Sequence, residues 1–427
     1  MPDFHPRALL PLLRSRIDRW PIAVLTGARQ SGKTTLVRDL LPRHGVRAIA
    51  YTSLDDPDER LRLAAEPVRL LNRPDALVVL DEVQKQAGLL DAVKLLADRK
   101  AGHKFLLLGS SQILLLRQIR ETLAGRATLL DLWPLALAER VDARAVPPSG
   151  LDRIWHDGER ALSRLGVAAR PVEDERRWRH VRDEHLMWGG YPGLEPLAPE
   201  DRAVWLRDFR RTYLERDLGD LGRVADLDQF ALAQNLLAAR TGQLLSYSEV
   251  ARELGVAVNT VKRYVRFLEI SYQVVLLRPL LPTTTARLVK SPKLYWTDPG
   301  LARILSERMS VDDGSLYETF VLCELLRWAS WQPDAPQIHF YRTHAGLEID
   351  FVVHTPRLAL AIEARAGRRA GAADARSLAA ALPDLRIPGL RANAARLGIV
   401  VSRAAQMTEV GRNLWSIPDW VLFGPAA

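Results

Sequence analysis

The sequence predicts an α/β protein whose N-terminal third forms a parallel sheet with helices on both faces. Five short apolar runs of strand length lie in the first 135 residues, at residues 21–26, 46–51, 76–80, 104–108 and 127–132. Helix-compatible segments separate these runs. Near-continuous apolar strands that alternate with helices are typical of a parallel sheet buried on both sides.

The composition is that of a globular protein with several domains. The chain has 427 residues, of which 48% are hydrophobic and 26% are charged, and this excludes a mainly disordered chain. At roughly 150 residues per domain, the length suggests two to four domains. We expect the parallel-sheet core over residues 1–140, a linker or poorly packed insertion over 141–185, a helical region with a small β element over 186–305, and a mixed α/β domain over 306–427.

Charge and cysteine content narrow the classes of partner and location. Lys and Arg number 60 against 51 Asp and Glu, and the resulting charge of +9 favours polyanionic partners. The single cysteine excludes an intramolecular disulfide and a thiolate metal cage. No apolar stretch approaches the roughly 18–20 residues that span a bilayer, and the first ten residues lack the order of a signal peptide. We therefore expect a cytoplasmic protein with no membrane partner.

A phosphate-binding loop follows the first predicted strand. Residues 27–34, GARQSGKT, fit the pattern G-x-x-x-x-G-K-[ST] and precede a helix-compatible segment over 35–41. The glycines let backbone N–H groups turn toward phosphate oxygens, Lys33 adds a positive charge, and Thr34 offers a hydroxyl to Mg²⁺. The predicted nucleotide site comprises Gly27, Ala28, Arg29, Gln30, Ser31, Gly32, Lys33, Thr34 and Thr35. Arg29 either contacts the nucleotide or forms an internal pair.

Two acids follow the third predicted strand, VVL, at its carboxyl end. In a parallel sheet this end lies near the phosphate loop, where Asp81 could hold the Mg²⁺ shell. Glu82 could then polarise the attacking water as a general base. The alternative is that both are solvated acids at a strand end. The presence of the second acid favours hydrolysis over a binding switch.

Three further candidates belong to the same region. Ser110 and Ser111 follow the fourth predicted strand, where a hydroxyl could position the water or could simply cap the next helix. Arg126 precedes the fifth strand. It could reach a neighbouring subunit's nucleotide, where such an arginine can raise the rate about 10³–10⁵-fold, or it could be an ordinary surface arginine.

The middle region contains a helix-turn-helix pattern. Ser246 and Glu249 offer a capping box before a short helix that ends near Gly255, and a second helix follows over 259–268. At about 100° per residue, one arc of this second helix is apolar and an arc of about 100° is polar and basic. The apolar arc contains Val258, Val261, Val265 and Leu268, and the basic arc contains Asn259, Lys262, Arg263 and Arg266.

This order of elements is that of a DNA-binding helix-turn-helix. Lys290 and Lys293 lie in a β-like stretch downstream, which could act as a wing over the phosphate backbone. The alternative is a packing or protein-binding role. If DNA is bound, we expect phosphate contacts to dominate over base reading.

The C-terminal region contains the segments GLEIDFVV and LAIEAR, with the acids Asp350 and Glu363. In these segments the region resembles the core of restriction-endonuclease-like domains, in which two metal-binding acids stand at the positions of Asp350 and Glu363. Glu318 or Glu324 would be the extra acid on the preceding helix, and Arg365 occupies the usual lysine position. Because a guanidinium does not give up a proton, we expect a structural or DNA-holding domain without nuclease activity. An active nuclease and an unrelated α/β domain remain as alternatives.

Across nearly its whole length the chain resembles prokaryotic AAA+ ATPases that bear a C-terminal domain of unknown function. The shared segments include LTGARQSGKTTL, YTSLDDP, VVLDEVQ, LLLGSSQ, LAGRATLLDLWPLALAE, WGGYPG, NTVKRYVRFLE, KSPKLYWTDPGLA and LEIDFVV. The resemblance implies a P-loop AAA+ core, ATP and Mg²⁺ as cofactors, and a homo-oligomer such as a hexameric ring. It also makes Arg126 the arginine-finger candidate.

Together these features predict an ATP-hydrolysing motor or remodeller that acts on double-stranded or branched DNA, as in repair or recombination. Two alternatives remain open. One is a nucleotide-gated switch that binds a protein partner, and the other is an ATP-dependent nuclease of a defence system.

Overall fold

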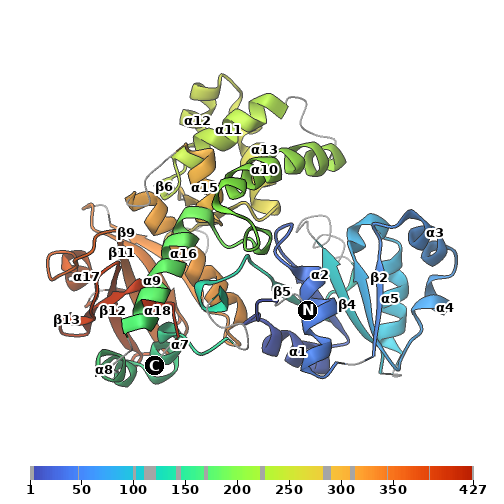
Figure 1. Cartoon of the computed structure of the whole chain (residues 1–427), viewed down its shortest axis with the longest axis horizontal. Coiled ribbons are helices and arrows are strands. Elements are labelled where there is room, and N and C mark those ends of the chain that lie inside the picture. The colour runs from blue at the N-terminus through green and yellow to red at the C-terminus, as the bar shows by residue number, and fades with distance from the viewer. Residues whose placement is uncertain are drawn as a thin grey trace. The chain divides into compact units, whose positions relative to one another are not determined.

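The fold is described from a computed structural model of the chain (Figure 1). The structure describes residues 4–46, 48–99, 102–109, 122–140, 146–167, 172–221, 227–281, 290–307, 313–343, 345–383 and 385–425. The chain forms two compact units. The first comprises Met1–Leu135, Ile270–Tyr272 and Ser330–Pro333, and the second comprises Ala136–Glu269, Gln273–Ala329 and Asp334–Ala427.

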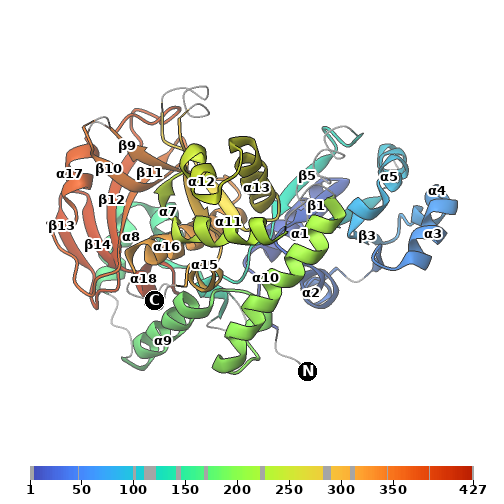
Figure 2. The same cartoon turned by 90° about the horizontal axis from the view of Figure 1, so that it is seen from above.

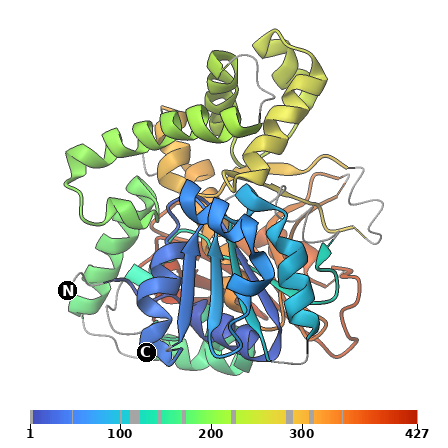
Figure 3. The ribbon, with the colours of Figure 1, turned by 90° about the vertical axis from the view of Figure 1, so that its right-hand side faces the viewer.

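A five-stranded parallel sheet forms the centre of the first unit, and Figure 3 shows its blue to cyan strands side by side. The strands are β1 (Ile22–Thr26), β2 (Ile49–Ser53), β3 (Leu77–Asp81), β4 (Lys104–Gly109) and β5 (Ala127–Asp131), in the order β2-β3-β4-β1-β5. Every neighbouring pair is parallel. The predicted parallel sheet is therefore confirmed, with the second strand two to three residues later than expected.

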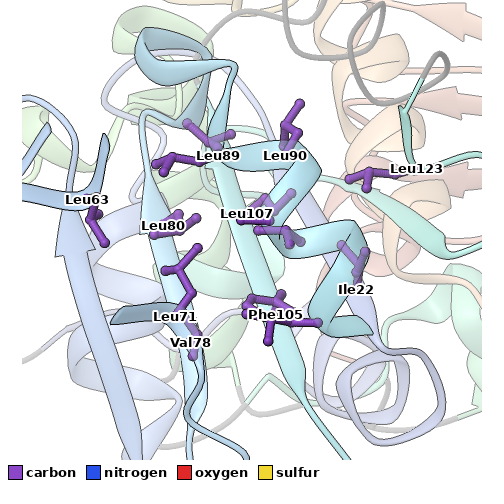
Figure 4. Packing of buried hydrophobic residues seen from close by; sticks show 14 of the residues in the cluster. Ile22, Leu63, Leu71, Val78, Leu80, Leu89, Leu90, Phe105, Leu107 and Leu123 are labelled. Carbon is purple, nitrogen blue, oxygen red and sulfur yellow. The ribbon is translucent and has the colours of Figure 1, made fainter. Parts of the chain in front are cut away.

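The helices of this unit are α1 (Leu10–Arg19), α2 (Lys33–Thr35), η1 (Leu36–Leu40), η2 (Pro42–His44), α3 (Pro57–Ala65), α4 (Pro67–Leu71), η3 (Val83–Gln86) and α5 (Leu89–Asp98). Because successive strand residues point to opposite faces, the strands β1, β3 and β4 each contribute to two cores. Ile22 and Val24 pack with α5 in one core (Figure 4), while Ala23 and Leu25 pack with α1 in the other. Burial on both faces explains the continuous apolar runs.

The second unit begins with helices, of which α10 is the longest (Figure 2). They are η4 (Leu137–Arg140), α7 (Gly150–Asp157), α8 (Glu159–Val167), α9 (Val172–Trp188), η5 (Pro192–Leu194) and α10 (Pro199–Leu221). This corrects the linker expected over 141–185, since α7, α8 and most of α9 fall within it. The Pro-Pro-Ser-Gly segment is a helix start, in which Ser149 and Asp152 form a capping box. In α7, the apolar residues Leu151, Ile154 and Trp155 form a narrow buried stripe.

A small antiparallel sheet lies among the helices that follow. The elements in chain order are α11 (Leu227–Ala239), β6 (Gln243–Leu244), α12 (Tyr247–Leu254), α13 (Val258–Ile270), β7 (Val274–Leu277), β8 (Lys293–Trp296) and α15 (Pro299–Leu305). The three strands are antiparallel in the order β6-β8-β7, so β8 is the middle strand. Gly255, in the left-handed conformation with φ +67°, separates α12 from α13.

The remainder of the second unit is a six-stranded mixed sheet in the order β13-β14-β12-β11-β10-β9. Its elements are α16 (Gly314–Trp331), β9 (Gln337–Arg342), β10 (Glu348–His354), β11 (Leu358–Arg365), α17 (Arg376–Ala381), β12 (Ala395–Ser402), β13 (Thr408–Gly411), β14 (Leu414–Pro418) and α18 (Asp419–Leu422). Strands β10 and β11 are antiparallel neighbours, and α17 packs against one face of the sheet. Across the described ranges, no helix is long and apolar enough to cross a bilayer.

Candidate functional site

The phosphate loop joins β1 to α2 and has the backbone that its glycines are expected to allow. Gly27, Gln30 and Gly32 all have positive φ, at +152°, +57° and +93°. A Cβ atom at Gly27 would lie 2.1 Å from the Leu132 carbonyl oxygen, so no larger residue fits there. Left-handed residues within such a loop turn successive N–H groups toward one concave side, which is a means of binding anions.

Two side chains of the loop are buried and fit a phosphate ligand. The Lys33 ammonium donates hydrogen bonds to the carbonyl oxygens of Gly27 and Ala28, each at 2.8 Å. The hydroxyl of Ser31 is buried and has no hydrogen-bond partner among the described residues. A buried polar atom without a partner costs free energy unless a ligand satisfies it. Arg29 is half-buried.

The Asp81 carboxylate at the end of β3 accepts three hydrogen bonds. The Thr34 hydroxyl donates to Asp81 Oδ2 at 2.9 Å, and the Tyr51 phenol donates to the same oxygen. The backbone N–H of Glu82 donates to Asp81 Oδ1 at 2.9 Å. Burial and the adjacent Asp81 carboxylate raise the pKa of Tyr51, so its phenol remains a donor. Thr34 and Asp81 are thus in contact, as a shared Mg²⁺ site requires.

Glu82 follows in a left-handed conformation, with φ +54° and ψ +43°. A non-glycine residue in this region carries strain, and such strain is concentrated at functional sites. The Gln84 side-chain amide donates to Glu82 Oε2. The backbone therefore leaves the direction of β3 at Glu82, at the edge of the sheet where the phosphate loop lies.

Contacts beneath the loop fix its position against β5. Tyr272 Oη lies 2.5 Å from Asp131 Oδ1 and 2.7 Å from Thr26 Oγ1, and Thr26 is the residue before Gly27. Arg7 donates to the carbonyl oxygens of Ser31 and Trp133, at 2.7 and 2.6 Å. These long-range contacts hold the loop at Ser31 and at Thr26, the residue that precedes it.

The remaining ATPase candidates are not brought to this cluster. Ser110 and Ser111 lie outside the described residues. Arg126 precedes β5, at the edge of the sheet opposite to the phosphate loop, because Ala127 is level with Ile22 at the start of β1. Its guanidinium pairs with Asp98, with Nε 2.6 Å from Oδ1, and lowers the pKa of that carboxyl. Within one chain Arg126 does not meet the loop.

The predicted basic arc of α13 faces solvent. Asn259, Lys262, Arg263 and Arg266 are exposed, whereas Val261, Val265 and Leu268 are buried. Val258 is 39% exposed, so the apolar arc is shorter by this one residue. Arg266 pairs with Glu269 at 2.9 Å. At the start of α12, the Ser246 hydroxyl accepts the Glu249 N–H at 3.4 Å, which is the first half of the predicted capping box.

Lys290 is exposed, but Lys293 corrects the predicted wing contact. Lys293 is only 4% exposed, and its ammonium lies 3.1 Å from Glu318 Oε1 and 2.5 Å from Glu348 Oε1. It starts the middle strand of the three-stranded sheet, where these two carboxylates neutralise it. Burial alone would lower its pKa, but Glu318, Asp350 and Glu348 outweigh burial and raise it. A buried, paired lysine does not contact a DNA backbone.

Lys293 lies among four acidic side chains, which we define as the acid cluster: Glu318, Glu348, Asp350 and Glu363. Asp350 and Glu363 lie on the neighbouring strands β10 and β11, as predicted. Arg365 Nη2 lies 2.8 Å from Glu363 Oε2, and Arg365 Nη1 lies 3.5 Å from Asp350 Oδ2. Among the described residues, no group of three or more His, Cys, Asp or Glu side chains could hold a metal ion. Two protein cations therefore lie among the carboxylates.

The acid cluster also decides between the two candidate third acids. Glu318 on α16 belongs to it, and burial and Asp350 raise its pKa to about 7. Glu324 instead pairs with Arg327 at 2.7 Å and accepts the N–H of Leu137. Burial and Asp350 raise the pKa of Glu363 to about 9.

Sequence reasoning missed Tyr51, Arg7 and Tyr272. The pairing of β2 with β3 points to Tyr51. Ser53 of β2 is level with Asp81, and Tyr51, two residues before Ser53, lies on the same face of β2. The sequence holds no comparable signal for Arg7 and Tyr272, because their partners lie far away along the chain.

Comparison with known proteins agrees with this arrangement. The AAA domain family matches residues 19–141, and two domains of unknown function, DUF8612 and DUF4143, match residues 179–312 and 313–420. The uncharacterized proteins Mb2031c of Mycobacterium bovis and Rv2008c of Mycobacterium tuberculosis are each 31% identical over 426 residues, which cover 97% of this chain and 82% of theirs.

A Walker-type ATPase of Pyrococcus abyssi, PABY2304, is similar in structure, with 16% identity and a TM-score of 0.42 over 71% of this chain and 98% of that chain. The chain belongs to the family of the two mycobacterial proteins, and its residues 19–141 form an AAA domain.

Proposed function

We propose that the chain hydrolyses ATP with Mg²⁺ at the phosphate loop and uses this reaction to act on DNA. Lys33 would bind the β- and γ-phosphates, and Thr34 and Asp81 would hold Mg²⁺. When bound, Mg²⁺ would neutralise charge on the phosphate oxygens. Glu82 accepts a proton from the attacking water, whose oxygen bonds to the γ-phosphorus as the bond to the bridging oxygen breaks. The products are ADP and phosphate.

One observation carries the ATPase proposal: the hydrogen bond of 2.9 Å between Thr34 and Asp81. It brings together the hydroxyl of the loop and the acid of β3, two groups that are far apart in the sequence. Glu82 lies one residue further, in a conformation that an ordinary solvated acid would not need. Ser110, Ser111 and Arg126 complete the proposal. One of the serines positions the water, and Arg126 comes from a neighbouring subunit of a homo-oligomer.

The DNA proposal rests on α11, α12, α13 and the three-stranded sheet. Their order of helix, strand, helix, helix and two further strands supports a winged helix, in which α13 would lie along DNA. Asn259, Lys262, Arg263 and Arg266 give that helix an exposed polar and basic face. Lys290 would add a contact from the wing. We propose duplex or branched DNA as the load.

ATP hydrolysis measured with and without DNA tests this function. Added duplex or four-way junction DNA should accelerate phosphate release by the wild-type protein. Reversing Lys262, Arg263 and Arg266 to Glu should weaken DNA binding and remove the acceleration. The slope of log affinity against log salt should become shallower by about 1 for each DNA phosphate that the variant no longer neutralises. Basal hydrolysis should remain.

The matched control reverses Arg153, Arg160 and Arg164, which are exposed on α7 and α8 and change the net charge equally. This control should bind DNA like the parent. Equal losses in both triple variants would mean that only overall charge matters, and they would remove α13 from the DNA interface.

A protein-binding switch is the second candidate, because the same region exposes apolar side chains. Leu227 and Leu232 on α11 are 41% and 59% exposed, and Val258 is 39% exposed. In that case DNA would not accelerate hydrolysis. The nuclease alternative has less support, because Lys293 and Arg365 pair with the acids that would bind its metal.

A further inference from the structure

Tyr51 contacts the acid that we assign to the Mg²⁺ site. Its phenol donates to Asp81 Oδ2, the same oxygen that accepts the Thr34 hydroxyl at 2.9 Å. The other oxygen, Oδ1, accepts the Glu82 N–H. Asp81 therefore has two side-chain donors on one oxygen and one backbone donor on the other.

The two side-chain donors would differ in their relation to Mg²⁺. In the proposed function, the Thr34 oxygen would be a ligand of the metal as well as a donor to Asp81. Tyr51 and the Glu82 N–H would act on the carboxylate alone and would set its orientation. Side chains that orient metal-binding groups in this way typically change metal affinity or activity about 10–100-fold when they are removed.

Tyr51 is itself held in place from two sides. It lies on β2, level with Val79 of β3, and on the same face as Ser53, which is level with Asp81. The Arg38 guanidinium lies 5.2 Å from the centre of the Tyr51 ring. Arg38 belongs to η1, the continuation of the helix that follows the phosphate loop. Contacts thus run from Arg38 to Tyr51, from Tyr51 to Asp81 and from Asp81 to Thr34. They connect the helical segment after the phosphate loop to the strands β2 and β3.

We infer that Tyr51 is a positioning residue for Mg²⁺, acting through Asp81. The inference rests on the proposed ATPase function. The Tyr51 hydroxyl keeps one oxygen of the Asp81 carboxylate fixed, so that this carboxylate would hold the metal without reorientation. Loss of the hydroxyl therefore weakens the response to Mg²⁺ and leaves metal-free nucleotide binding intact.

Equilibrium binding of a fluorescent ATP analogue tests the inference. Binding is measured for the full chain in EDTA and over a Mg²⁺ titration, and Tyr51→Phe is compared with the wild type. The Mg²⁺ concentration at half-maximal response should rise about tenfold or more in Tyr51→Phe. Affinity in EDTA should stay unchanged. Tyr341→Phe, which removes a phenol on β9 in the second unit, is the matched control and should behave like the parent.

A double-mutant cycle separates positioning from a general structural role. In an Asp81→Asn background, Tyr51→Phe should cause no further change in the Mg²⁺ requirement, because the residue acts through the lost carboxylate. Additive effects, or an equal loss of affinity with and without Mg²⁺, would overturn the inference. So would a Tyr51→Phe titration that coincides with that of the wild type.

The outcomes also distinguish the inference from the function on which it rests. If the wild-type protein binds the analogue with Mg²⁺ dependence and Tyr51→Phe does the same, the role of Tyr51 alone is refuted. If the wild-type protein does not bind the analogue, both are refuted.

Discussion

The two units each contain a pair of candidate metal-binding acids, but the groups that contact these acids differ. Asp81 accepts hydrogen bonds from neutral donors, namely the hydroxyls of Thr34 and Tyr51 and a backbone N–H. Asp350 and Glu363 instead pair with Arg365. Lys293 pairs with the neighbouring Glu318 and Glu348.

Neutral donors orient a carboxylate without neutralising its negative charge, which remains able to attract a metal ion. A cation in an ion pair neutralises that charge. Burial and Asp350 also raise the pKa of Glu363, to about 9. A protonated or ion-paired acid is a poor ligand for a divalent cation. We therefore propose that the acids of the first unit serve ligand binding and those of the second unit serve internal stability.

The largest expected effect comes from the same substitution in each unit. Glu82→Gln should retain ATP binding and lower the rate of hydrolysis about 10²–10⁴-fold, the usual contribution of a general base. Glu363→Gln should leave hydrolysis unchanged. Phosphate release under saturating ATP measures both. Brisk turnover by Glu82→Gln would place the base elsewhere, and a matching loss in Glu363→Gln would end the contrast between the units.

A second test replaces the lysine of each site with methionine. Lys293→Met removes a buried cation from the partly buried carboxylates of Glu318 and Glu348. Breaking a buried pair costs about 3–5 kcal/mol of unfolding free energy, which is the upper limit of the expected loss. Lys33→Met should abolish nucleotide binding and change stability far less. Chemical denaturation without nucleotide measures both variants. A Lys293→Met protein as stable as the parent would show that the acid cluster does not depend on this cation.

A third test uses the pH dependence of stability. In the folded protein the pKa values of Glu318 and Glu363 are raised to about 7 and about 9. The folded state therefore binds these protons more tightly than the unfolded state. The stability this provides is present in full below the ordinary carboxyl pKa of about 4.3 and is lost as pH rises through the folded values. The loss is about 1.4 kcal/mol for every tenfold difference in proton affinity between the two states.

Glu363→Gln mimics the protonated acid and should flatten this decline between about pH 7 and pH 9, the interval between the two raised pKa values. Glu82→Gln, in the other unit, should keep the wild-type decline. Melting temperatures across this range provide the measurement. Parallel curves for Glu363→Gln and the wild type would refute the role of this carboxyl.

Local patterns explain why some features are predictable. The loop from Gly27 to Thr34 and the acid after β3 are encoded by short segments, and the parallel sheet follows from apolar runs that need only length and composition. The ends of α13 are predictable to within two residues, because the two faces of this helix differ in polarity.

Features that depend on distant partners are not predictable in this way. Lys293 looks like a surface lysine in sequence, and only the approach of Glu318 and Glu348 buries it. Tyr272 contacts Asp131, although the two residues are 141 positions apart in the sequence. The helices within 141–185 have narrow apolar stripes among many arginines, so their sequence resembles a linker. Only the structure shows that Leu151 and Trp155 are buried.

Retention of ATP by the purified chain in magnesium buffer tests the central claim most directly. The wild-type protein should retain labelled ATP, and Lys33→Ala should lose it, because the Lys33 ammonium supplies the charge that the phosphates require. Equal retention by the two proteins, or none by either, would contradict a phosphate site at this loop.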